Sequence, residues 1–135
     1  MARLETIKSL SEEHNKLLRD ECDINSASAL LKAGARPADR QMIAEMVGVA
    51  PSLVLEWLHQ ADMAQVKGIG REYLGLLSSI GVRNLDDLKQ QNPETLHQTM
   101  EESNGNEELV HRLPTLEMVT DWVEQANEIS PMIKG

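Results

Sequence analysis

Residues 66–83, "VKGIGREYLGLLSSIGVR", decide the fold because they place a Gly-Ile-Gly turn between two apolar helical stretches. Glycine adopts positive φ without steric cost, so this turn can reverse the chain sharply and bring two backbones close together. We expect the second helix to begin at Gly70. The stretch therefore predicts two short helices that are joined by a tight turn and pack against each other.

The turn is compatible with binding a phosphate. The first N–H groups of a helix point outward and can bind a phosphate oxygen. Gly68, Ile69 and Gly70 would shape such a site, while Lys67 and Arg71 would add positive charge. Contacts of this kind hold a nucleic-acid backbone without recognising its bases.

The same turn is also compatible with a purely structural role, which we favour and in which the glycines let the helices pack and Ile69 fills the core between them. Glu72 beside Arg71 reduces the local positive charge. Tyr73 is the only aromatic residue near the turn, so no platform for base stacking is predicted. Both functions stay open at the level of the turn.

Composition predicts one domain and an acidic surface. The chain has 135 residues, of which 41% are apolar, and its formal net charge is −9. Residues 63–85, which include Arg83, carry a net charge of +2, whereas residues 86–110 carry −6. The negative long-range field would slow the approach of a polyanion such as DNA.

Helix signals dominate the whole chain, and no alternating run rich in Val, Ile and Thr indicates a strand. We expect an all-α protein with roughly nine to eleven short helices. Residues that favour a helix start or end punctuate the sequence: Ser11, Pro51, Asn92-Pro93 and Thr115 at starts, and Gly34, Gly48 and Gly81 at ends.

Two segments of the chain resemble each other, "LEWLHQAD" (55–62) and "TDWVEQAN" (120–127). The start, "IKSLSEEHNKLL" (7–18), similarly matches "VKGIGREYLGLL" (66–77). We therefore predict two repeated helix–turn–helix halves, about residues 4–62 and 63–129, within a single domain spanning 1–135. The matched positions in the first pair are Trp57 with Trp122, Gln60 with Gln125, and Ala61 with Ala126.

The ordered motifs resemble a bacterial family of unknown function that is assigned to the helix-hairpin-helix superfamily. The likeness covers roughly residues 7–128 and rests on "LLKAGAR", "IAEMVGVAPSLVLEWLHQAD", "KGIGREY", "LDDLKQQNPETLH" and "RLPTLEMVTDWVEQA". It implies an all-α fold of helical hairpins and no known catalytic activity. The chain departs from the hairpin pattern at Ser9-Leu10-Ser11, where the first turn lacks glycines, and at Leu74, where a small residue is common.

Other residues admit a structural and a functional interpretation. Trp57 and Trp122 are expected to fill the core of their own halves, although each could anchor a partner. Gln60 and Gln125 are expected to cap or cross-link a helix end. The methionines are expected to fill the core or to form an adaptable partner surface; they include Met42, Met46, Met63, Met100, Met118 and Met132.

Titratable residues give no catalytic or metal-binding pattern. His59 and Asp62 share a helix face, but the spacing of His and Cys matches no zinc site. Cys22 has acidic neighbours and is expected to be an inert thiol. Asp86-Asp87 are expected at a helix start, where acids are favourable. The acidic run Glu101, Glu102, Glu107 and Glu108 is expected in a solvated loop or, alternatively, a docking patch for a basic partner.

We predict a non-catalytic protein without cofactor or metal that serves as a small acidic adaptor for another protein. The alternative is DNA binding without sequence specificity through Lys67, Gly68, Ile69, Gly70, Arg71 and Arg83. The N-terminal sequence has no secretion signal and the only cysteine is Cys22, so we expect a cytoplasmic protein. No apolar run reaches the ~20 residues that span a bilayer, so no membrane contact is expected.

Overall fold

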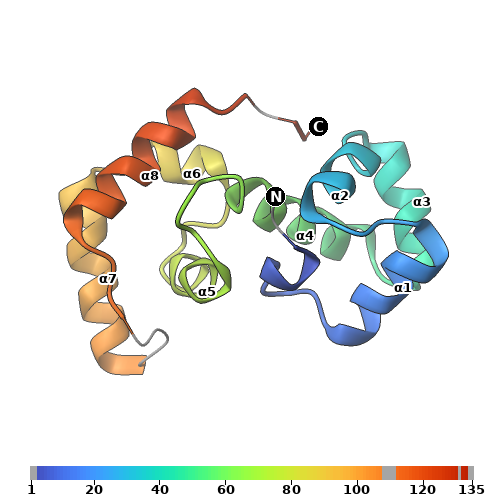
Figure 1. Cartoon of the computed structure of the whole chain (residues 1–135), viewed down its shortest axis with the longest axis horizontal. Coiled ribbons are helices and arrows are strands. Elements are labelled where there is room, and N and C mark those ends of the chain that lie inside the picture. The colour runs from blue at the N-terminus through green and yellow to red at the C-terminus, as the bar shows by residue number, and fades with distance from the viewer. Residues whose placement is uncertain (1–2, 108–111, 131, 134–135) are drawn as a thin grey trace.

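The computed structural model describes residues 3–107, 112–130 and 132–133. Over these ranges the chain is all helical, with eight α-helices, one 3₁₀ helix and no strand (Figure 1). This confirms the predicted all-α class. The elements are η1 (Leu4–Thr6), α1 (Glu12–Cys22), α2 (Ala27–Ala33), α3 (Pro37–Val47), α4 (Pro51–Met63), α5 (Arg71–Ser79), α6 (Leu85–Lys89), α7 (Pro93–Glu107) and α8 (Leu116–Glu128).

Helix starts follow the sequence signals closely. Proline occupies the first turn of α3, α4 and α7, where its missing N–H costs nothing. Polar side chains cap several starts, including that of α7, by accepting a backbone N–H from the first turn. These caps are Ser11 on α1, Ser26 on α2, Asn84 on α6, Asn92 on α7 and Thr115 on α8.

Two of the expected C-terminal glycines behave differently. Gly48 ends α3 with φ +78°, a left-handed conformation that glycine adopts readily. Gly34 follows α2 with φ −111°, so its backbone does not require glycine. A Cβ there would instead lie 2.9 Å from the Leu58 side chain, and packing against α4 favours the small residue.

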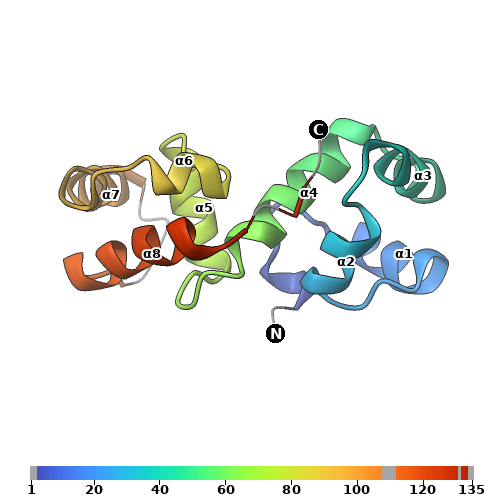
Figure 2. The same cartoon turned by 90° about the horizontal axis from the view of Figure 1, so that it is seen from above.

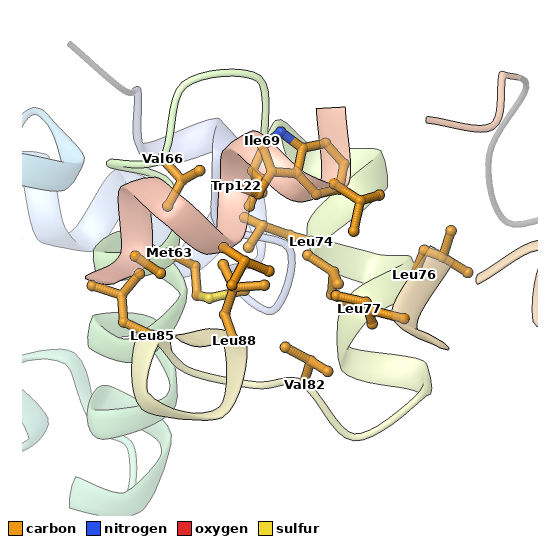
Figure 3. Close-up of a cluster of buried hydrophobic side chains, with 14 of the residues drawn as sticks. Met63, Val66, Ile69, Leu74, Leu76, Leu77, Val82, Leu85, Leu88 and Trp122 are labelled. Atoms are coloured by element: carbon orange, nitrogen blue, oxygen red, sulfur yellow. The ribbon is translucent and has the colours of Figure 1, made fainter. Parts of the chain in front are cut away.

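The buried side chains form two separate clusters, which define two lobes (Figures 1 and 2). The first lobe has a core within residues 4–61, and the second has a core within residues 63–126 (Figure 3). Helix α4 joins them, because Trp57 and Leu58 belong to the first core and Met63 belongs to the second. The division between the cores falls at the predicted boundary of the halves, and the internal duplication itself stays a prediction.

Both ends of the chain contact the opposite lobe. Near the N-terminus, η1 lies close to α5, and the stem of Lys8 packs beside Gly75. After α8 the chain returns toward the first lobe (Figure 1), where Met132 and Ile133 pack against the first core. Besides α4, both chain ends therefore contribute contacts between the lobes.

Two expectations need correction, and one of two alternatives is excluded for a pair of methionines. Residues 101–107 continue helix α7 instead of forming a loop, and Glu108 lies outside the described residues. The i, i+3 and i+4 spacing of the apolar residues from Leu116 onward predicts one buried face for α8. Leu116 is nevertheless 41% exposed, because it lies in the first turn, beyond the second core. Of the two interpretations of the methionines, core filling does not apply to Met42 and Met46, which are 60% and 50% exposed.

No single helix in the described ranges is long and apolar enough to cross a membrane. Helices α3 and α4 would reach that length only as a pair, and this pair is bent by 111°.

Candidate functional site

The Gly-Ile-Gly turn has the predicted local geometry. Gly68 adopts φ +98°, and Gly70 is the N-cap of α5, which begins at Arg71. Ile69 is 4% exposed and belongs to the second core (Figure 3). The turn therefore reverses the chain and anchors it through a buried side chain, as the structural interpretation requires.

Two side chains of helix α8 contact this turn. Gln125 Oε1 accepts the Lys67 backbone N–H at 2.8 Å, and its Nε2 donates to the Lys67 carbonyl at 3.3 Å. A Cβ at Gly68 would lie 2.9 Å from Trp122 Nε1. Gly68 is thus needed for its positive φ and for the close approach of the indole ring, and Gln125 cross-links the turn to α8.

The first lobe holds its own turn with Gln60 and Trp57, which the sequence comparison matched with Gln125 and Trp122. Gln60 Oε1 accepts the Ser9 N–H at 3.0 Å, and Trp57 Nε1 donates to the Ser9 carbonyl at 3.4 Å. The glycine-free turn of the first lobe is therefore held by Trp57 and Gln60 of α4. The Gly-Ile-Gly turn is held by Gln125 of α8 and lies against Trp122. Each tryptophan also contacts one aromatic ring of its own lobe, His14 with Trp57 at 5.5 Å between centroids and Tyr73 with Trp122 at 5.2 Å.

Arg71 joins the two lobes. Its Nη1 donates to the Glu5 carbonyl at 2.8 Å and to the Ile7 carbonyl at 3.2 Å. These acceptors lie in and just after η1, in the first lobe. The guanidinium is therefore already engaged in a contact between lobes, although it was predicted to supply charge to a phosphate.

The six residues predicted to bind phosphate do not come together. Lys67, Gly68, Ile69 and Gly70 line a cavity of about 500 Å³ between the turn and α2. Arg83 lines a different cavity, of about 270 Å³, beside α4. Arg71 contacts η1, and Arg83 lines the second cavity. Of the three predicted cations, only Lys67 is therefore among the described residues that line the 500 Å³ cavity.

Asp62 and His59 line a further cavity, of about 200 Å³, where α4 meets α6 and the C-terminal segment. Asp62 is only 5% exposed, and it accepts a hydrogen bond from Gln65 Nε2. Burial raises the pKa of Asp62 to about 6, against the smaller opposing effect of the Gln65 bond. The sequence placed His59 and Asp62 on one helix face but gave no signal that this acid is buried.

Among the large apolar side chains of the described residues, the two most exposed lie on α3. Met42 and Met46 are 60% and 50% exposed and lie four residues apart, so they share a helix face. Met46 Sδ lies 4.0 Å from Cys22 Sγ at the end of α1. We call Met42, Met46 and Cys22 the methionine face. From the sequence, an adaptable partner surface is only one of two interpretations of the methionines.

The thiol of the methionine face is a weak nucleophile. Burial, together with the negative charge of Glu21, raises the pKa of Cys22. A raised pKa lowers the thiolate fraction at neutral pH, so Cys22 is suited to packing more than to chemistry.

The family profile described as a domain of unknown function (DUF4332) matches residues 7–129. No curated protein and no solved structure matches the chain.

Proposed function

The chain belongs to the DUF4332 family, whose function is unknown, and we propose from its own geometry that it is a non-catalytic, acidic adaptor. In this proposal it binds another protein through the methionine face. The observation that carries the proposal is the exposure of Met42 and Met46, at 60% and 50%, on one side of α3.

Methionine suits a binding surface because its flexible side chain and polarisable sulfur adapt to irregular partners. A lone exposed apolar residue needs no explanation, but neighbouring ones that form a patch point to a contact with another molecule. Here Met46 extends the patch to Cys22 on helix α1, which lies beside α3. The contrast with Met63 and Met100, which are buried in the second core, supports a separate role for the α3 pair.

Photo-cross-linking in cells tests this function. With benzoylphenylalanine at position 42, we expect a discrete adduct with another protein, because the side chain would lie in the interface. The matched control carries the same amino acid at position 116, which is also exposed and apolar but lies on α8. An absence of adducts from position 42, or the same adducts from both positions, would overturn the proposal.

The alternative function is binding of the DNA backbone at the Gly68-Ile69-Gly70 turn. It is supported by the N-terminus of α5, which no side chain caps at Gly70, and by the exposed Lys67 beside it. It is weakened by the contacts of Arg71 with η1 and because Arg83 lines a different cavity from the turn. This alternative requires duplex DNA to bind with an affinity that falls steeply as salt is raised.

A further inference from the structure

We propose that the partner of the methionine face is a basic amphipathic helix. Its apolar side would cover Met42 and Met46, and its Lys or Arg residues would lie against the acidic side chains around them. This inference rests on the proposed function and adds the chemistry of the partner. It follows from the charges and helix ends that surround the face.

Acidic side chains border the methionine face on both helices. Glu45 is exposed on α3, next to Met46 in the chain. Glu21 is exposed on α1, and its charge acts on the Cys22 thiol, which lies 4.0 Å from Met46 Sδ. Asp20 and Asp23 are also exposed at this end of α1. A cationic partner is therefore favoured at the Cys22 end of the face.

Three basic residues in or beside α1 and α3 are directed elsewhere or lie at the far end of α3. Arg19 pairs with Glu5 at 3.0 Å. Arg40 on α3 is 7% exposed and donates to the carbonyls of Gly34 and Ala35. Arg36 precedes α3, at the opposite end from Met46. The charge next to Met46 and Cys22 thus remains negative.

Two helix C-termini add to the negative potential. Helix α1 ends at Cys22 and α3 ends at Val47, and each is followed by a left-handed cap, Asp23 and Gly48. The carbonyl end of a helix carries a partial negative charge that favours cations. Both ends lie at the same side of the methionine face, so they reinforce Glu21 and Glu45.

The shape of the apolar patch favours a helix over an extended segment. Met42 and Met46 are separated by one helical turn and form a narrow stripe that continues to Cys22 on α1. A helical partner presents apolar residues at positions i, i+3, i+4 and i+7, which match a stripe of this kind. Its opposite side can stay solvated, while lysines at the border of its apolar side reach the acidic rim.

The test uses a synthetic amphipathic peptide of Leu and Lys, about 18 residues long, or five helical turns. Its binding is measured by fluorescence anisotropy at about 150 mM salt, where long-range attraction is screened. Two control peptides have either the same composition without a helical apolar side, or Glu in place of Lys. We expect saturable binding of the Leu–Lys peptide only.

Variants locate the binding surface. We expect Met42→Ser with Met46→Ser to weaken binding at least about tenfold, because two apolar contacts are lost. The matched control, Leu113→Ser with Leu116→Ser, changes two exposed apolar residues near the start of α8 and should leave affinity unchanged. Glu21→Gln with Glu45→Gln should weaken binding severalfold and reduce its salt dependence. Circular dichroism confirms that each variant is folded.

Undiminished affinity in the methionine variant, or equal binding of the Glu peptide, would overturn this proposal. The results also distinguish a failure of the basic-helix proposal from a failure of the adaptor proposal. A specific cross-link from position 42 without peptide binding would reject the basic helix and leave the adaptor standing. If the methionine variant instead changes the oligomeric state of the chain and the peptide does not bind, the face joins two copies and the basic helix is rejected.

Discussion

Replacing Trp122 by alanine is expected to lower the free energy of unfolding by about 4 kcal/mol, because it opens a large cavity in the second core. Trp122 is 1% exposed, and its ring contacts Tyr73 at 5.2 Å between centroids. It also packs against Gly68, so the turn loses its support from α8. Urea unfolding followed by far-UV circular dichroism measures the change.

The matched control is Leu116→Ala on the same helix, which removes a side chain that is 41% exposed and should cost less than about 1 kcal/mol. The remaining Trp57 reports on the first core by fluorescence. A loss below about 1 kcal/mol for Trp122→Ala would contradict the tryptophan's place at the centre of the second lobe.

Replacing Asp62 by asparagine is expected to stabilise the protein by about 3 kcal/mol at pH 7.5. Asp62 is 5% exposed, and burial raises its pKa from 3.8 to about 6. The folded state therefore binds the proton more tightly than the unfolded state does. The cost of the buried carboxylate is absent below pH 3.8, grows between pH 3.8 and about 6, and is complete above that range.

Asparagine keeps an oxygen that can accept the hydrogen bond from Gln65 Nε2, so the substitution removes chiefly the charge. Urea unfolding at pH 7.5 and at pH 3.5 measures the difference, which should nearly vanish at the lower pH. The control is Asp121→Asn on the exposed side of α8. Equal effects of Asp62→Asn at both pH values would show that burial of the ionised carboxylate does not cost stability here.

Local sequence rules account for much of the fold. Prolines and capping residues mark most helix starts, since these effects depend on residues within one turn of each other. The turn at Gly68 and the buried Ile69 also follow from a short motif. Trp57 and Trp122 lie in the cores because large apolar side chains on the inner face of a helix are removed from water there.

The rest depends on contacts between residues far apart in the chain. Arg71 donates to carbonyls of residues 5 and 7, which no pattern near residue 71 specifies. Asp62 is buried because α6 and the C-terminal segment cover the end of α4. The periodicity of α3 shows which residues share a face, but only the placement of its neighbours leaves Met42 and Met46 exposed.

The central claim is that the chain binds through the methionine face and not through the Gly-Ile-Gly turn. Chemical-shift mapping of the labelled chain, titrated with the Leu–Lys peptide and with a short DNA duplex at low salt, tests it most directly. We expect the peptide to shift the methyl signals of Met42 and Met46, and the duplex to leave the amides of residues 67–73 unchanged. Saturable duplex-induced shifts in residues 67–73, lost at higher salt and in Lys67→Glu, would contradict the claim.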